Sequence, residues 1–477
     1  MGKMGSGTVY LMIAELAAIA SNYLVHIGLA RYLGKETYGI FGIIMSLYLI
    51  NRAFLNTGVP RAVSKFLSET KANIPAVFQS SFRLQLILAT LFAGLYIIFS
   101  KPLALILNDI ALVPYILILG VMVIPLSILA LYLSGYMNGL RMFKQQSIIK
   151  VVYPILRIIF TLILVLLGLK IYGAMFGYLL GTIVSVFIAK PMIKKIGKSK
   201  QVFSHWKILK FSVPLTIAAL GLTFSRNINV LFIKAILSDN ALAGLYTSAA
   251  TLSNIPYLVF AALPLTLMPS ISKSLSAANF KLTRKYINES MRYIFLFLAP
   301  ITVMVSLTSS QLISLLYSSS YESGGPVLSV LIFSSTFLAI FAVLVAVITG
   351  SGKPKIEMYI TLLLVIAITI LNLALIPIFG ILGAALASLY TSLLALTIAA
   401  AYVLIKFKAL ISFTSFTKII LATLIVFFVA FFWHYSGLFL LVNYLVYLII
   451  YFIVLLCLGE LKEDDLKLLT GLIKKSR

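Results

Sequence analysis

Four ionisable side chains lie inside long apolar stretches of this sequence and are its first candidates for chemistry. Arg52, Arg157 and Arg226 carry guanidinium groups, and Glu15 carries a carboxylate. An ionisable group within a membrane-spanning segment is costly unless it faces a water-filled cavity or a partner. Because the cations outnumber the acid, we predict a cationic interior. Guanidinium groups bind the oxygens of phosphates and carboxylates in pairs, so this interior would suit an anionic ligand.

Each of these residues also has a structural interpretation. An arginine could bond a backbone carbonyl or Glu15 and only hold helices together. Glu15 could take up a proton or a sodium ion, with burial or nearby charge shifting its pKa, or it could neutralise Arg52. His26 lies about three helical turns after Glu15, on roughly the same face, as a packing residue or a cavity group.

The elements that must position these residues are helices in a membrane. Of the 477 residues, 62% are hydrophobic and 10% are charged, and single apolar runs exceed the ~18 residues that indicate a span. We predict an all-α polytopic membrane protein with about fourteen transmembrane helices. The first two lie near residues 8–30 and 39–60, and the fifth and sixth near 147–168 and 172–192. The single cysteine, Cys457, excludes an intrachain disulfide and a cysteine metal cluster.

The basic residues predict the orientation of the chain. Most of the 38 lysines and arginines fall in alternate loops and in the tails, as expected for the cytoplasmic side of a cell-membrane protein. We therefore predict a multi-pass protein with both termini cytoplasmic. An anionic inner leaflet accounts for the net charge of +26, so membrane lipids are the expected partners and nucleic acid is not. No complete nucleotide-binding loop is present, and we expect no cofactor.

Two halves of the chain look related. The segment 33–41 (LGKETYGIF) and the segment 237–246 (LSDNALAGLY) are both polar turns that end in glycine, an aliphatic residue and an aromatic one. At the far ends of the following helices, 60–67 (PRAVSKFL) parallels 269–275 (PSISKSL). We predict an N-terminal six-helix lobe at 1–192, a basic cytoplasmic linker at 193–207 and a C-terminal six-helix lobe at 208–405. Two additional helices at 406–458 and a cytoplasmic tail at 459–477 follow.

The segment 29–41 (LARYLGKETYGIF) resembles the signature between the first two helices of the polysaccharide biosynthesis (oligosaccharide flippase) family. That family belongs to the multidrug/oligosaccharidyl-lipid/polysaccharide exporter superfamily. The segments 58–66 (GVPRAVSKF) and 267–272 (LMPSIS) are similar to its stage V sporulation protein B branch. The glycine-rich turn 349–354 (TGSGKP) falls where members of the family often have a glycine-rich, basic segment.

The resemblance implies two six-helix lobes around a central cavity that opens alternately to either side, and a lipid-diphosphate-linked sugar as substrate. A diphosphate would then contact Arg52 and Arg226, one in each lobe, with Arg157 as a third candidate. The amides of Asn22 and Asn229 could hold sugar hydroxyls, or could equally bond across helices. We expect a flippase that works by alternating access, as a monomer, without enzymatic activity.

Two other functions remain open from the sequence. The superfamily also contains ion-coupled multidrug extruders. A cationic substrate would require an acidic binding cavity rather than a basic one. A membrane glycosyltransferase or polymerase would want carboxylates on long outer loops, and this chain has few and scattered ones.

Overall fold

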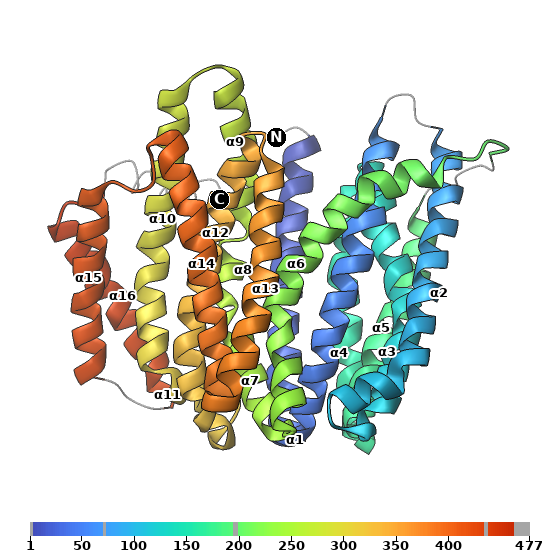
Figure 1. Ribbon diagram of the computed structural model, residues 1–477, viewed down its shortest axis with the longest axis horizontal. Coiled ribbons are helices and arrows are strands. Elements are labelled where there is room, and N and C mark those ends of the chain that lie inside the picture. Colours follow the sequence, from blue (N-terminus) through green and yellow to red (C-terminus); the bar gives the residue numbers. More distant parts are fainter. Residues whose placement is uncertain (1–2, 70–72, 194–198, 434–436, 462–477) are drawn as a thin grey trace. The chain divides into compact units, whose positions relative to one another are not determined.

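The computed structural model is built from helices, and among the residues it describes (3–69, 73–193, 199–433 and 437–461) none forms a strand (Figure 1). The predicted all-α class is confirmed. The long helices are α1 (Lys3–Ser68), α2 (Ile74–Ile106), α3 (Val113–Ala130), α4 (Phe143–Leu164), α5 (Lys170–Met192), α6 (His205–Leu237), α7 (Asn240–Ser253), α9 (Ala262–Ser276), α10 (Phe280–Leu307), α12 (Gly325–Gly350), α13 (Pro354–Phe379), α14 (Ile381–Phe407), α15 (Phe413–Phe432) and α16 (Phe439–Cys457). Shorter helical pieces are η1 (Ile110–Leu112), η2 (Leu131–Met137), η3 (Val165–Leu169), α8 (Ile255–Val259), α11 (Ser309–Leu316) and η4 (Ser319–Gly324).

Within the described residues, 12 helical stretches are long and apolar enough to cross a membrane. Two of them, Ala14–Ser68 and Phe143–Met192, are each long enough to contain two of the predicted spans. Gly34 interrupts the first with φ +75° and Gly168 interrupts the second with φ +87°, a backbone conformation that glycine adopts without steric cost. The helix direction therefore changes at both glycines. Gly34 lies between the first two predicted spans, and Gly168 is the last residue of the predicted fifth span. The count of fourteen stays a prediction.

The chain divides into two compact units. Unit 1 comprises Met1–Thr247 and Thr369–Ile381, and unit 2 comprises Ser248–Ile368 and Leu382–Arg477. The division into units reflects which residues pack together, and it does not test the lobe boundaries predicted from the sequence repeat. Those boundaries stay a prediction. Part of the predicted linker (194–198) and most of the predicted tail (462–477) lie outside the described residues.

Glycines let α4 and α5 approach closely in unit 1. A Cβ added to Gly177 would lie 2.5 Å from the backbone of Thr161, and one added to Gly181 would lie 2.9 Å from the Cα of Arg157. Small residues at such a spacing allow helix backbones to meet in a membrane. This contact places Arg157 of α4 beside Tyr178 of α5.

The predicted additional helices, α15 and α16, pack on α10 within unit 2. Tyr447, Tyr451 and Leu296 are among the buried residues of their common core. At one end, Arg292 of α10 donates to the Glu460 carboxylate over 2.6 Å, and their side chains are 8% and 4% exposed. A buried ion pair of this kind connects the end of α16 to α10.

Candidate functional site

Arg157 is the centre of the candidate site, although the sequence ranks Arg52 and Arg226 above it. Its side chain is 5% exposed, and its guanidinium carbon lies 4.7 Å from the ring centre of Tyr178 and 5.8 Å from that of Tyr153. A cation over an aromatic face is stabilised by up to about 2 kcal/mol when water is excluded. The aromatic rings thus offset part of the cost of burying this charge.

Three tyrosines form this environment, which we call the tyrosine cluster: Tyr48 of α1, Tyr153 of α4 and Tyr178 of α5. The hydroxyls of Tyr48 and Tyr153 are 3.2 Å apart and hydrogen bonded, and the rings of Tyr48 and Tyr178 meet edge to face at 6.0 Å. The cluster joins three helices of unit 1 around one guanidinium group.

Among the residues that the structure describes, several polar atoms in and beside the tyrosine cluster have no hydrogen-bond partner. They are the Nε of Arg157, the hydroxyl of Tyr178 and the hydroxyl of Thr161, one turn further along α4. Within the described parts of the chain, no carboxylate lies at ion-pair distance from Arg157. A buried polar atom without a partner costs about 1–3 kcal/mol, and more when it is charged. The arrangement is therefore a buried cation with unused donors.

Arg52 and Arg226 take different positions on the same unit. Arg52 is exposed and lies four residues after Tyr48 on α1, and its charge acts electrostatically on Tyr48 and Tyr153. Arg52 and Arg157 thus influence the same tyrosines. Arg226 of α6 is half-buried, and its charge acts on Tyr23 of α1 instead.

Glu15 and His26 do not share one environment. Glu15 is exposed and forms an ion pair with Lys150 of α4, a partner that the sequence analysis did not consider. His26 is buried, and its Nδ1 lies 2.9 Å from the hydroxyl of Tyr38 in a hydrogen bond. In this structure, then, His26 packs and Glu15 pairs with a lysine rather than with Arg52.

The two asparagines also differ. Asn22 is half-buried on α1. Asn229 of α6 is 2% exposed, and its side-chain oxygen accepts a hydrogen bond of 2.8 Å from the amide of Asn372 in α13. Asn229 therefore bonds across helices, which is one of the two roles that the sequence left open.

Sequence reasoning did not single out the tyrosines of the cluster. A signal was present: Tyr48 precedes Arg52 by four residues, and Tyr153 precedes Arg157 by four. Residues four apart lie on one face of a helix. Two tyrosine–arginine pairs at this spacing, on separate helices of the predicted first lobe, mark the same cluster from two sides.

The two related sequence segments meet each other at another place in unit 1. A Cβ on Gly39 would collide with the backbone of Asn240 and Gly244, and one on Gly244 would collide with that of Lys35 and Gly39. Both glycines belong to the repeated motif, so equivalent glycines of the two halves lie back to back.

Beside this contact, Asp109 joins the end of α2 to α6 and α7. Its Oδ2 lies 2.9 Å from the Nζ of Lys234 and accepts a 3.2 Å hydrogen bond from the amide of Asn240. Burial raises the pKa of the Asp109 carboxyl, but hydrogen bonds from Lys234 and Asn240 and the charge of Lys234 outweigh burial and lower it below its usual value. The sequence alone did not indicate that Asp109 and Lys234 form a pair.

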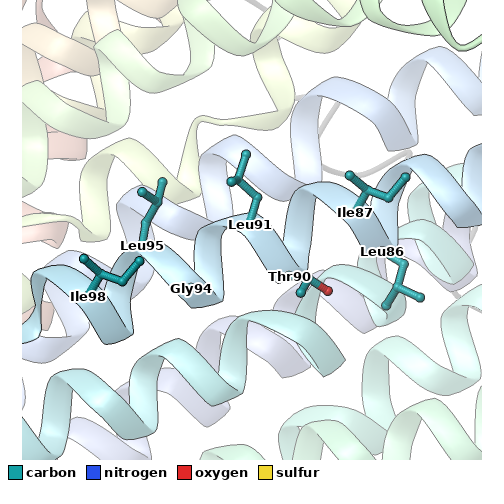
Figure 2. Close-up of a pocket in the computed structure, with 7 residues that line it drawn as sticks. All are labelled: Leu86, Ile87, Thr90, Leu91, Gly94, Leu95 and Ile98. Atoms are coloured by element: carbon teal, nitrogen blue, oxygen red, sulfur yellow. The ribbon is translucent and has the colours of Figure 1, made fainter.

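A hollow of about 540 Å³ on α2 is a different kind of surface. Its lining residues all come from α2: Leu86, Ile87, Thr90, Leu91, Gly94, Leu95 and Ile98 (Figure 2). Figure 2 shows Ile87, Leu91 and Leu95 pointing to one side of the helix, with no charged side chain in the lining. The hollow suits hydrocarbon rather than an anion, so we do not assign the site to it.

Comparisons with known proteins agree on the fold. A family model described as polysaccharide biosynthesis protein matches residues 4–275, and one described as MatE matches residues 214–378. The lipid II flippase MurJ of Bacillus subtilis is 25% identical over 81% of this chain and 80% of its own length. Stage V sporulation protein B of the same organism is 23% identical over 66% of this chain and 67% of its own length. A solved structure of lipid II flippase MurJ in an inward closed conformation superposes with a TM-score of 0.75, at 18% identity, over 94% of this chain and 97% of that one.

Proposed function

Because the chain belongs to the polysaccharide biosynthesis family of membrane transporters, which are not enzymes, we propose that it flips a lipid-linked saccharide diphosphate across the cell membrane. The family resemblance read from the motif at 29–41 is thereby confirmed. The similarity to MurJ and to stage V sporulation protein B supports a flippase. The substrate class is our proposal.

The buried guanidinium of Arg157, which has no carboxylate at ion-pair distance in the described part of the chain, carries this proposal. Leaving one charge of a buried pair without its partner is strongly destabilising, by about 3–5 kcal/mol. An ion retained under that cost is explained if an anion arrives during the transport cycle. A diphosphate would supply oxygens for the free Nε of Arg157 and for the hydroxyl of Tyr178.

Arg52 has the complementary property, since it is exposed and acts on the same tyrosines. We propose that Arg52 meets the diphosphate first and that Arg157 becomes accessible to it when the helices rearrange. Arg226 would contribute from α6. The headgroup would pass through this cationic region, and the lipid chain would stay in the bilayer. Coupling to protons or sodium through Glu15, a monomeric state and cytoplasmic termini are further parts of the proposal.

The test is transbilayer movement in liposomes of a fluorescent polyprenyl-diphosphate sugar, measured for the wild type, Arg52→Ala, Arg157→Gln and Arg226→Ala. Loss of one charge-assisted contact removes about 1.5–3 kcal/mol, so Arg52→Ala and Arg157→Gln should each slow flipping about 10- to 100-fold. Arg83→Ala is the matched control, because Arg83 is an exposed arginine on α2, outside the tyrosine cluster. It should flip at the wild-type rate.

Two comparisons separate charge recognition from damage to the fold. Arg157→Lys keeps the positive charge but loses the planar guanidinium and its paired N–H donors. Its flipping rate should lie between those of the wild type and Arg157→Gln. A polyprenyl monophosphate sugar should move more slowly than the diphosphate in the wild type, and this difference should shrink in Arg52→Ala. A flipping rate that neither the Arg52 nor the Arg157 substitutions change would show that these residues are not part of the site. No flipping of any such lipid would refute the proposed function.

A second function has one observation in its favour, the match of residues 214–378 to the MatE family model. As an extruder, the chain would move organic cations in exchange for an ion bound at Glu15. Dye-cation uptake into inverted vesicles that disappears in Glu15→Gln would favour that function. The buried positive charge of Arg157, beside the tyrosine cluster, argues against a cationic cargo.

A further inference from the structure

A small surface between α5 and α6 combines exposed apolar side chains with lysines. Val202 is 75% exposed and Trp206 is 72% exposed, and Lys200, Lys207 and Lys210 are exposed beside them in the sequence. We call these five residues the linker surface. Exposing large apolar side chains to water to this extent is unfavourable, and such a surface, with lysines beside it, is often covered by a partner or a membrane.

The linker surface is held in place by the rest of unit 1. The amide of Asn73 donates to the side-chain oxygen of Gln201 over 2.8 Å. The backbone N–H of Phe203 donates to the hydroxyl of Ser80 over 3.0 Å, and the Phe203 ring lies 5.2 Å from that of Phe66. The segment is thus docked on α1 and the start of α2, while Val202 and Trp206 stay exposed.

The position of the surface along the chain identifies what covers it. α6 begins at His205 and runs directly into a stretch apolar enough to span a membrane. Trp206 therefore lies at the start of a candidate membrane span, and tryptophan is enriched at the membrane–water interface. Lys65 adds a further cation there, with its Nζ 4.4 Å from the ring centre of Phe211. Exposed lysines close in the sequence to an apolar anchor match an anionic membrane surface.

We propose that the linker surface binds anionic phospholipid headgroups, with Trp206 and Val202 inserted at the interface and Lys200, Lys207 and Lys210 on the phosphates. The connection between the two sequence repeats is thereby anchored to one leaflet. This role is independent of the substrate that the protein moves, and it holds whether the cargo is a lipid-linked sugar or a drug.

The tryptophan content of the chain allows a direct test. The full sequence has 2 tryptophans, and Trp433→Phe leaves Trp206 as the only one. The backbone carbonyl of residue 433, which accepts a hydrogen bond from Tyr447, is unchanged by this substitution. The full-length Trp433→Phe protein is placed in lipid nanodiscs of phosphatidylcholine, with a small fraction of spin-labelled phosphatidylglycerol or of spin-labelled phosphatidylcholine. The label sits near the top of the acyl chain in both lipids and quenches Trp206 fluorescence on contact.

Labelled phosphatidylglycerol should quench Trp206 several-fold more strongly than labelled phosphatidylcholine, since each lysine near an anionic lipid favours it by up to about fivefold. Replacing Lys200, Lys207 and Lys210 together with glutamine should make the two lipids equal. The matched control replaces Lys273, Lys281 and Lys285 with glutamine, which removes the same charge from exposed positions of unit 2 and should leave the preference intact.

Three outcomes would overturn the proposal. Equal quenching by the two lipids in the Trp433→Phe protein would mean that the lysines do not select anionic headgroups. Strong quenching by aqueous iodide, with none by either lipid, would mean that water or a soluble partner covers Trp206. Stronger quenching by a label at the end of the acyl chain would place Trp206 deep in the bilayer, away from headgroups. Failure of the flipping assay would leave these results unaffected.

Discussion

Replacing Asp109 with asparagine tests whether a single carboxylate holds α2 to α6 and α7. The substitution keeps the size of the side chain and removes its charge. Lys234, whose side chain is 2% exposed, would then keep its charge without an anion 2.9 Å away. Asn240 would still have an oxygen to bond, so the change isolates the ion pair from the neighbouring hydrogen bond.

The magnitude follows from the burial of the two partners. Breaking a fully buried ion pair costs about 3–5 kcal/mol, because one charge is left without compensation. The Asp109 side chain is 16% exposed, so water reaches part of the site and softens the loss. We expect Asp109→Asn to lower the free energy of unfolding by about 2–3 kcal/mol. Lys234→Met should cost less, because the remaining carboxylate can hydrate.

Equilibrium unfolding in mixed detergent micelles measures these values, with Glu289→Gln as the control. Glu289 pairs with Lys285 at 3.8 Å, and their side chains are 46% and 67% exposed, so its loss should cost under about 0.5 kcal/mol. The double variant Asp109→Asn/Lys234→Met should recover part of the loss. If Asp109→Asn were no more destabilising than Glu289→Gln, the reasoning about the buried pair would be refuted.

The same carboxyl has a predicted pH dependence. Its folded-state pKa is lowered, so the pair contributes stability above the unfolded pKa and loses it as the pH falls through the folded one. The difference in unfolding free energy between the wild type and Asp109→Asn should be constant from about pH 8 to pH 5 and should shrink below about pH 4. A difference that instead grew below pH 4 would contradict the sign of the shift.

Two further predictions concern packing and the second buried pair. Gly177→Ala should destabilise the protein by about 1–3 kcal/mol, because the added Cβ would meet the backbone of Thr161. Gly94→Ala is the control: among the described residues nothing lies within 4 Å of its added Cβ, so it should be near neutral or slightly stabilising in the same unfolding assay. Arg292→Met should cost about 3–5 kcal/mol by leaving Glu460 buried and unpaired. Recovery of stability in Arg292→Met/Glu460→Met would confirm that reason, whereas an equal loss in the double variant would assign the cost to packing.

Much of the fold was predictable from the amino-acid sequence, because membrane spans depend on local composition. A run of about twenty apolar residues must form a helix in lipid, since a bilayer offers its backbone no other hydrogen-bond partners. The all-α class and the family follow from such runs and from the motif at 29–41. The interruption at Gly34 also follows, since Gly34 falls between two predicted spans, whereas Gly168 lies at the end of the predicted fifth span. The sequence likewise limited the candidate site to a few arginines in apolar segments.

Which arginine is central was decided only by the tertiary structure. Whether Arg157 faces lipid, a partner or a cluster depends on how α4 is rotated against α5, and the contact of Gly177 and Gly181 with α4 sets that rotation. The pairing of Glu15 with Lys150, and of Asp109 with Lys234, joins residues more than a hundred positions apart. Local periodicity places a residue on one face of its own helix and carries no information about which helix lies opposite. Composition and periodicity therefore predicted the helices and the kinds of side chain in the site, and long-range packing decided which of those side chains meet.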